Sequence, residues 1–204
     1  MNIQEITESR TQDPQITQKP QKAFRYARDV IGGEFPEGEA AITRNLEYAY
    51  LYARDVIEGR FLLGEVSIAK NSMYAYQYAR DVIKRLEGEN RWPAGEKSIA
   101  RHPHYAVLYA REVIEGRFPE AERNIAMYPR SSFLYALHVI KRLEGENRWP
   151  AGEESIARDT RFAYLYAAVI KGRWPEPHRA EAEANIKKDP SMWSIYEKLV
   201  KHEI

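Results

Sequence analysis

Apolar residues recur along this chain with the spacing of an α-helix. In the clearest copy, Ala49, Tyr52, Ala53, Val56 and Ile57 occupy positions i, i+3, i+4, i+7 and i+8. Side chains at this spacing share one face of a helix, so the segment predicts a helix that buries one side and exposes the other.

A glycine follows the apolar stripe in most copies. We expect it to end the helix, because the residue just past a helix C-terminus commonly adopts a positive φ angle. The glycines expected to do so are Gly32 with Gly33, Gly59, Gly116 and Gly172.

An aromatic residue and a second apolar segment come next. A proline usually follows the aromatic residue, and it suits the first turn of a helix, where its missing N–H has no partner to lose. Glutamates then favour the positive end of the helix dipole. Each copy therefore predicts a hairpin of a longer helix A and a shorter helix B. The aromatic positions are Phe35-Pro36, Phe61, Trp92-Pro93, Phe118-Pro119, Trp149-Pro150 and Trp174-Pro175.

The hairpin repeats along the chain. One tyrosine marks each copy, at intervals of 26, 26, 31, 26, 31 and 30 residues: Tyr26, Tyr52, Tyr78, Tyr109, Tyr135, Tyr166 and a degenerate Tyr196. A lone hairpin cannot bury its apolar stripe, whereas stacked hairpins can. The sequence predicts an all-α fold, a right-handed α-solenoid of about six short helical hairpins with a C-terminal capping helix.

The two ends of the chain depart from the repeat. Residues 1–22 are polar and are predicted to form a flexible N-terminal arm or a partial cap. Residues 23–190 hold the solenoid. Residues 191–204 place Trp193, Tyr196 and Leu199 on one side of a last helix, which we expect to cap the stack.

The composition bounds the class of protein. Lys and Arg number 31 and Asp and Glu 30, which disfavours a mainly electrostatic binder of nucleic acid or membranes. The chain has no cysteine, which fits a reducing compartment. Neither a secretory signal nor an apolar run of about 20 residues is visible. We expect a soluble cytoplasmic protein.

Catalytic and metal-binding motifs are missing from the sequence. The five histidines do not have the spacing of a zinc site, and there is no glycine-rich phosphate loop, nucleophile elbow or HExxH motif. We therefore expect no enzyme, no cofactor and no metal. An enzyme would instead show a closed pocket holding a carboxylate or histidine with a shifted pKa.

Two rows of repeated residues admit more than one interpretation. Arg-Asp pairs could grip a polar ligand or form inter-repeat ion pairs at a solvated edge. The tyrosines could stack nucleic-acid bases or pack in the core with the hydroxyl at its rim. Repetition in each copy favours the structural role for both rows. The pairs are Arg28-Asp29, Arg54-Asp55, Arg80-Asp81 and the variant Arg111-Glu112.

One insertion occurs twice, letter for letter. The string KRLEGENRWPAGE spans Lys84–Glu96 and Lys141–Glu153, where Leu86 and Leu143 would continue the stripe. Gly88 and Gly145 would then end a helix A longer by about one turn. The string reflects either a recent duplication or a doubled protrusion for a partner, since Trp and Arg commonly anchor interfaces. The candidate partner-binding residues are Glu87, Asn90, Arg91, Trp92, Glu144, Asn147, Arg148 and Trp149.

The repeated phrase A-Y-x-Y-A-R-D-V-I-x-G-R-W-P-E-G-E resembles a repeat of uncharacterised helical-repeat proteins of tailed bacteriophages and large DNA viruses. AYLYARDVIEGRF (Ala49–Phe61), AYQYARDVI (Ala75–Ile83) and AYLYAAVIKGRWPE (Ala163–Glu176) carry it, and it covers about residues 23 to 188. The resemblance implies a viral protein acting in the cytoplasm of an infected bacterium. The doubled insertion and a one-residue deletion in YAAVI depart from the pattern.

Shared residues should hold the stack together, so function is expected in what differs between copies. α-Solenoids commonly present extended surfaces to proteins. The leading hypothesis is a phage-encoded module that binds, and inhibits, a host protein such as a defence or housekeeping complex. The alternative is a repeat protein that binds nucleic acid or nucleotides through its Arg and Tyr rows.

Overall fold

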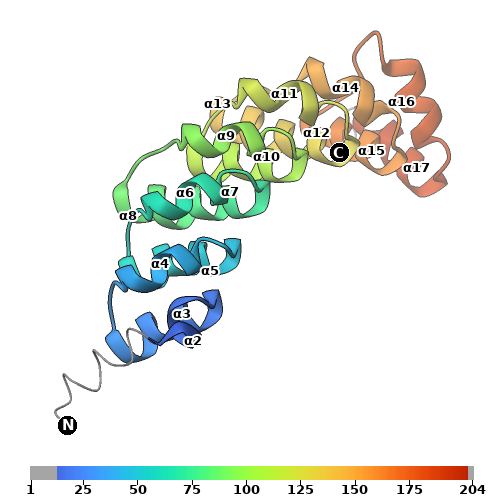
Figure 1. Cartoon of the computed structure of the whole chain (residues 1–204). Coiled ribbons are helices and arrows are strands. Elements are labelled where there is room, and N and C mark those ends of the chain that lie inside the picture. The colour runs from blue at the N-terminus through green and yellow to red at the C-terminus, as the bar shows by residue number, and fades with distance from the viewer. Residues whose placement is uncertain (1–12, 202–204) are drawn as a thin grey trace. The chain divides into compact units, whose positions relative to one another are not determined.

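The computed structural model describes residues 13–201, and every regular element in that range is a helix. The helices follow one another as hairpins (Figure 1). The chain divides into two compact units, Met1–Ile99 and Ala100–Ile204, each with three hairpins. The predicted all-α hairpin repeat is confirmed, and the right-handed sense of the stack stays a prediction.

The first unit holds a short leading helix and the first three hairpins. In the labels used here, η marks a π-helical segment. The elements are α2 (Pro14–Thr17), α3 (Pro20–Tyr26), η1 (Ala27–Ile31), α4 (Pro36–Ile42), α5 (Leu46–Tyr52), η2 (Ala53–Ile57), α6 (Leu62–Ile68), α7 (Ser72–Tyr78), η3 (Ala79–Lys84), α8 (Arg85–Glu87) and α9 (Pro93–Ile99).

The second unit holds the next three hairpins and a last single helix. Its elements are α10 (Pro103–Tyr109), η4 (Ala110–Ile114), α11 (Pro119–Ile125), α12 (Pro129–Tyr135), η5 (Ala136–Lys141), α13 (Arg142–Glu144), α14 (Pro150–Ala157), α15 (Thr160–Ile170), α16 (Arg179–Ile186) and α17 (Pro190–Val200).

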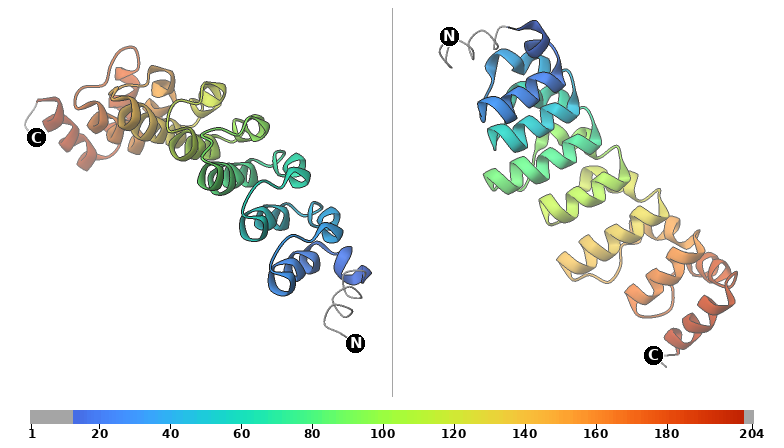
Figure 2. Two further views of the ribbon diagram at one scale, coloured as in Figure 1. Left: turned by 90° about the vertical axis from the view of Figure 1, so that its left-hand side faces the viewer. Right: turned by 90° about the horizontal axis from the view of Figure 1, so that it is seen from below.

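Each unit has two layers of helices. In the first unit, the A helices α3, α5 and α7 contact one another in order, as do the B helices α4, α6 and α9. The second unit repeats this with α10, α12, α15 and α17 in one layer and α11, α14 and α16 in the other. Figure 2 shows the successive A helices lying side by side within each unit.

The start of each helix A is fixed by local chemistry. A side-chain oxygen of Asn45, Asn71, Asp159 or Asp189 accepts hydrogen bonds from amide groups of the first turn. These amides have no partner within the helix, so such a cap stabilises it by about 1 kcal/mol. The other A helices open with proline, as in α3, α10 and α12.

Five of the six A helices change into a π-helical segment at the alanine after the marker tyrosine. In the second hairpin the amide of Glu58 donates to the carbonyl of Ala53, five residues back. In the sixth hairpin the amide of Lys171 donates to Ala167, four residues back, and α15 is α-helical throughout. The sequence difference is one residue, YARDVI against YAAVI. The π segment is therefore the place where one extra residue is accommodated in the helix.

The C-cap of these helices lies one residue before the predicted glycine, both after a π segment and in α15. The residue with positive φ is the one directly after the isoleucine, namely Glu58 (50°), Glu115 (55°) and Lys171 (55°). The prediction that Gly59, Gly116 and Gly172 fill this role is wrong. Only the first hairpin has a glycine there, Gly32, with φ of 69°. Left-handed backbone is strained for residues that carry a Cβ, so three hairpins end on a disfavoured conformation.

Helix B begins as the sequence predicts in most copies. Prolines 36, 93, 119 and 150 each open their helix. Pro175 is the exception and its predicted role is wrong, because α16 begins only at Arg179. The additional residues between Trp174 and Glu181 form a turn that precedes the helix.

The domain boundaries need small corrections. The first helix A begins at Pro20, so the predicted boundary at residues 22/23 is wrong by three residues. Helix α2 packs against α3 and α4, which favours the partial cap over the flexible arm for residues 13–19. Helix α17 matches the predicted capping helix within one residue at its start. Residues 1–12 of the predicted arm and 202–204 of the cap lie outside the described residues.

The doubled insertion lengthens helix A as predicted. Helices α8 and α13 add one turn, and Gly88 and Gly145 end them with φ of 74° and 77°. The prediction that Leu86 and Leu143 continue the buried stripe is wrong, since their side chains are 41% and 40% exposed. The preceding π segment rotates the added turn away from the interior direction that a regular i+3 spacing implies.

The helix ends give a first test. Gly32→Ala should lower the free energy of unfolding by about 1 kcal/mol, because alanine is strained at positive φ. Gly59→Ala should be neutral or stabilising by up to about 1 kcal/mol, because alanine lowers the conformational entropy of the unfolded chain and causes no strain in the folded one. A Cβ on Gly59 would meet Ile57 at an ordinary 3.7 Å. Urea unfolding followed by circular dichroism measures both, and equal losses would contradict the assignment.

Candidate interaction surfaces

Within each unit, a buried tyrosine hydroxyl joins a helix A, or the last helix α17, to the hairpin before it. In the fifth hairpin, Tyr135 Oη accepts a hydrogen bond from the backbone amide of Phe118 at 2.8 Å. The same hydroxyl donates to Glu122 Oε1 at 2.8 Å. Phe118 and Glu122 belong to the preceding hairpin, so one side chain satisfies a loop amide and a carboxylate across the joint. We call this arrangement the tyrosine link.

The tyrosine link recurs with the same partners. Tyr52, Tyr78, Tyr166 and Tyr196 each accept from the amide of the aromatic turn residue and donate to a helix-B glutamate of the preceding hairpin. The linking tyrosines are at most 1% exposed, so the prediction that their hydroxyls lie at the rim of the core is wrong for them. A buried hydroxyl needs partners, and here the preceding hairpin supplies them.

An arginine holds the glutamate of most links. Arg117 Nε and Nη2 donate to the two oxygens of Glu122, each at 2.7 Å. Burial alone would raise the pKa of this carboxyl, but the hydrogen bonds from Arg117 and Tyr135 outweigh it and hold the pKa below its usual range. The phrase R-(F/W)-x-x-(G/A)-E is therefore a structural joint.

This joint changes the interpretation of the doubled insertion. Trp92 and Trp149 are only 2% exposed and pack against the rings of Tyr78 and Tyr135, with centroids 4.8 Å apart in both cases. The prediction that these tryptophans are exposed anchors for a partner is wrong. They occupy the aromatic turn position that phenylalanine fills in shorter copies.

The other predicted partner-binding residues differ in their role. Arg91 and Arg148 pair with Glu96 and Glu153 through two hydrogen bonds each, and Arg148 thereby holds the glutamate of the Tyr166 link. The remaining residues are exposed at the edge of the insertion, and their binding of a partner stays a prediction: Glu87, Asn90, Glu144 and Asn147.

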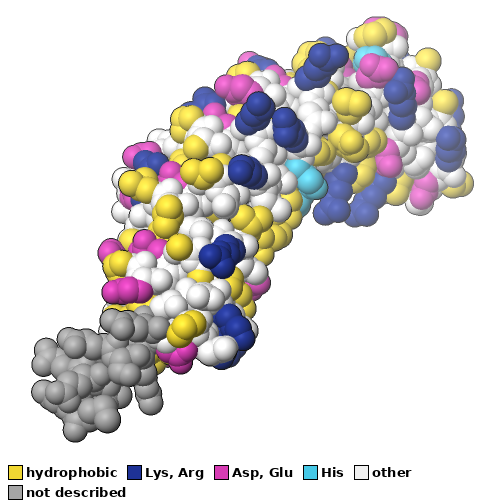
Figure 3. Space-filling view, in the orientation of Figure 1, with side chains coloured by type: hydrophobic (Ala, Val, Ile, Leu, Met, Phe, Trp, Pro, Cys, Tyr) yellow, Lys and Arg dark blue, Asp and Glu magenta, His cyan; other side chains and the backbone are white. Residues whose placement is uncertain are grey.

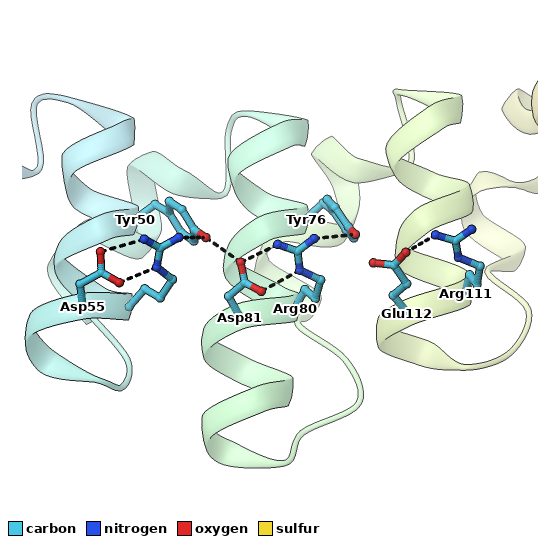
Figure 4. Close-up of polar contacts among 8 residues, drawn as sticks. Tyr50, Asp55, Tyr76, Arg80, Asp81, Arg111 and Glu112 are labelled. Carbon is cyan, nitrogen blue, oxygen red and sulfur yellow. Dashed lines mark hydrogen bonds and ion pairs between the residues drawn. The ribbon is translucent and has the colours of Figure 1, made fainter.

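The Arg-Asp pairs form a polar row in the first unit (Figure 4). Arg80 donates to both oxygens of its neighbour Asp81, at 2.7 Å each, and to Tyr76 Oη at 3.2 Å. Its guanidinium also lies over the Tyr76 ring, 5.3 Å from the centroid. Arg54 repeats this arrangement with Asp55 and Tyr50.

The row is linked between hairpins by a hydroxyl rather than by an ion pair. Tyr50 Oη donates to Asp81 Oδ2 of the next hairpin at 2.6 Å. The prediction of inter-repeat ion pairs is wrong here, because each arginine pairs with the adjacent aspartate of its own π segment. A hollow of about 340 Å³ beside the row is lined by Arg54, Asp55, Glu58, Asp81, Arg85 and Leu86. The arginines and carboxylates that line this hollow have opposite charges, which largely neutralise one another.

These contacts argue against the alternative that the tyrosines stack nucleic-acid bases. Bases stack on exposed aromatic faces, whereas the marker tyrosines of the second to sixth hairpins are 0% exposed. The aromatic residues two positions before the marker tyrosines are also buried in the first unit, where Phe24, Tyr50 and Tyr76 are 5% exposed or less. The rings of Phe24 and Tyr50 pack on Tyr48 and Tyr74 of the next hairpin.

An exposed apolar cluster lies on helix α6. Leu62, Leu63 and Val66 are 68%, 55% and 66% exposed. Figure 3 shows hydrophobic side chains over this part of the first unit. In the other B helices the first of these positions holds proline, or alanine in α16, the second glutamate or alanine, and the third alanine, lysine, arginine or glutamate. The sequence analysis missed this cluster, although aligning LLGEV with PEGEA and PAGEK reveals it.

A groove lies between α12 and α15 in the second unit. It has a volume of about 510 Å³ and is lined by Arg130, Phe133, Leu134, Arg161, Phe162 and Leu165. The sequence analysis missed it too, because it depends on residues of two adjacent A helices that are far apart in the chain.

No helix within residues 13–201 is both long and apolar enough to cross a membrane. No group of three or more His, Asp or Glu side chains in the described part of the chain is placed to hold a metal ion.

The tyrosine link predicts a specific loss of stability. Tyr135→Phe should lower the free energy of unfolding by about 1–3 kcal/mol, because it leaves the buried Phe118 amide without a partner and removes one donor from Glu122. Tyr128→Phe is the matched control, since that side chain is 49% exposed. Thermal and urea unfolding measure both variants. A Tyr135→Phe protein as stable as the control would contradict the role of the link.

The same links predict steep loss of stability in alkali. Burial is the main reason that the pKa of each linking tyrosine is raised, and it raises the pKa of Tyr196 to about 12. An unfolded tyrosine ionises near pH 10. The unfolded chain therefore releases protons that the folded chain retains. The stabilisation is complete below about pH 10 and is lost as the pH rises through the folded values.

Urea unfolding between pH 8 and about 11.5 tests this dependence. The free energy of unfolding should stay level to about pH 10 and then fall. Tyr196→Phe should make the fall less steep between about pH 10 and 12, where that residue contributes. A level profile to about pH 11.5, or an unchanged slope in Tyr196→Phe, would contradict the prediction.

Comparisons with known proteins leave the chain without an assigned relative. No protein-family model, no curated protein and no solved structure matches it.

Proposed function

We propose that this chain is a protein-binding helical-repeat module and that helix α6 contacts the partner. The observation that carries the proposal is the apolar cluster of Leu62, Leu63 and Val66, each more than half exposed on one short helix. Exposed apolar clusters of this kind are typical of protein–protein contact surfaces.

The repeat itself supports this interpretation. Its recurring polar and aromatic residues are used in joints between hairpins, as Tyr78, Glu65 and Arg60 are around α6. The three apolar residues take no part in that joint and are not required by the repeat, because other B helices carry polar residues or proline in their place. Burying them against a partner would contribute about 25 cal/mol per Å² of apolar surface.

The proposed partner is a protein of a bacterium infected by a virus that encodes this chain. The resemblance of the repeated phrase to phage repeat proteins supports this part of the proposal. Binding would block a defence or housekeeping complex of the host by covering its surface, with no catalysis and no cofactor required.

Replacing the three apolar residues of α6 with residues from the other B helices tests the proposal. Leu62→Pro, Leu63→Glu and Val66→Lys together turn LLGEVSI into PEGEKSI, and each new residue already occurs at that position in another hairpin. The fold should therefore be kept. The wild-type chain serves as bait in a nuclease-treated bacterial lysate. The purified captured protein is then titrated against the triple variant by calorimetry.

The triple variant should bind at least about tenfold more weakly, since each buried apolar side chain contributes about 1.5 kcal/mol or more. Ala151→Glu with Glu154→Lys on α14 is the control, because it changes the same kind of exposed helix-B position in the second unit. Equal binding by the triple variant would refute the α6 surface. Retention of nucleic acid alone, when nuclease is omitted, would refute a protein-binding function.

A further inference from the structure

The groove between α12 and α15 combines an apolar floor with a basic rim. Phe133 and Phe162 pack together with ring centroids 5.6 Å apart, and Leu134 and Leu165 extend the apolar surface. Arg130 and Arg161 stand in the first turns of the two helices and are exposed. No carboxylate is among the described residues that line the groove.

The two arginines of the rim are available to a ligand. Within residues 13–201, neither forms an ion pair or a hydrogen bond with another side chain. This separates them from Arg117 and Arg148 in the same unit, which hold glutamates of the joints. Figure 3 shows Lys and Arg side chains gathered at the lower edge of α12 and α15.

The basic rim is specific to the later hairpins. Its arginines occupy the position five residues before the marker tyrosine. Along the chain this position changes from neutral or acidic to basic: Gln21, Glu47, Met73, His104, Arg130 and Arg161. A residue that every joint requires would be the same in all hairpins. The residue at this position differs between hairpins, so Arg130 and Arg161 belong to the groove surface and not to the joints.

The acidic partners of the polar row disappear in the same hairpins. The Arg-Asp pair of the first unit becomes Leu137-His138 in the fifth hairpin and the single Ala168 in the sixth. Burial, together with the positive charges of Arg111 and Arg142, lowers the pKa of His138. Burial, Arg130 and two other cationic groups likewise lower the pKa of His104. The polar-row positions of the fifth and sixth hairpins therefore carry no carboxylate that could offset the charges of Arg130 and Arg161.

We propose that the groove between α12 and α15 binds an acidic peptide segment that carries aliphatic or aromatic side chains. Carboxylates of the peptide would form charge-assisted hydrogen bonds with Arg130 and Arg161, whose planar guanidinium groups suit that geometry. Its apolar side chains would cover Leu134, Phe162 and Leu165. The inference rests on the proposed protein-binding function but concerns a different surface from α6.

A protein segment fits this groove better than a nucleic-acid strand does. Phosphates would satisfy the arginines, but base stacking needs an open aromatic face. Phe133 is only 8% exposed and its ring packs on Phe162. The two leucines offer an aliphatic surface that complements leucine or phenylalanine side chains.

Three synthetic peptides of equal length test the proposal with the full chain. In the first, Leu and Phe alternate with Asp and Glu. The second has Asn and Gln at the acidic positions, and the third has Lys there. Fluorescence polarisation should show binding of the acidic peptide, at least about tenfold weaker binding of the amide peptide, and none of the lysine peptide.

Charge reversal of the two rim arginines tests whether the peptide binds in this groove. Arg130→Glu with Arg161→Glu should abolish binding of the acidic peptide and gain binding of the lysine peptide. Arg123→Glu, an exposed change on α11, is the matched control and should leave both unchanged. Leu165→Asp should weaken the acidic peptide while the arginines remain. Circular dichroism checks the fold, and the Arg→Gln pair replaces any reversed variant that unfolds.

The outcomes separate the two proposals. The α6 triple variant should bind the acidic peptide as the wild type does, even if it has lost the captured partner. Absence of peptide binding, equal binding of acidic and amide peptides, or no effect of the charge reversal would overturn the groove proposal. Preferential binding of single-stranded DNA that is lost in the reversed variant would overturn it in favour of nucleic acid.

Discussion

The stacking of this protein depends on a buried tyrosine hydroxyl that is shared between neighbouring hairpins. It accepts from the amide of the aromatic turn and donates to a glutamate, as Tyr166 does with Trp149 and Glu153 at 2.9 Å each. All three groups would be costly to bury without partners. The turn amide and the glutamate of one hairpin therefore have their hydrogen-bond partner only when the next hairpin is packed against them. The sixth hairpin keeps the link through Glu183 and Tyr196 despite its additional residues.

The π segment is the second constraint. One extra residue after the marker tyrosine places an arginine and an aspartate side by side at the helix surface, where Arg80 and Asp81 pair directly. The positive φ at the helix end does not depend on this extra residue, because Lys171 adopts it as Glu58 and Glu115 do. The sixth helix lacks the extra residue and remains α-helical to its end. The comparison within one chain shows that a single-residue difference decides between the two forms.

The recurring residues of the repeat form the joints and the π segments, so recognition is expected at the other surface positions. The α6 cluster and the α12–α15 groove stand out because both occupy positions where sibling hairpins differ. They have different chemistry, one apolar and one apolar with a positive rim. Solenoid proteins gain specificity by varying such positions on a constant frame. In this chain the two surfaces belong to different units, so each can be altered without disturbing the joints of the other.

The sequence by itself determined the hairpin repeat, its period, the proline starts of most B helices and the caps at Gly88 and Gly145, because these follow from local periodicity and backbone chemistry. It also placed the marker tyrosines in the core. Only the tertiary structure decided that their hydroxyls are buried and bonded, that Trp92 and Trp149 are core residues, and that Glu58 rather than Gly59 turns the chain. The physical reason is that burial and helix ends depend on contacts between segments, which the spacing of residues along one helix does not specify. The partners of a linking tyrosine hydroxyl come from another hairpin, and the groove needs two helices about 30 residues apart in sequence, so the local sequence pattern specifies neither.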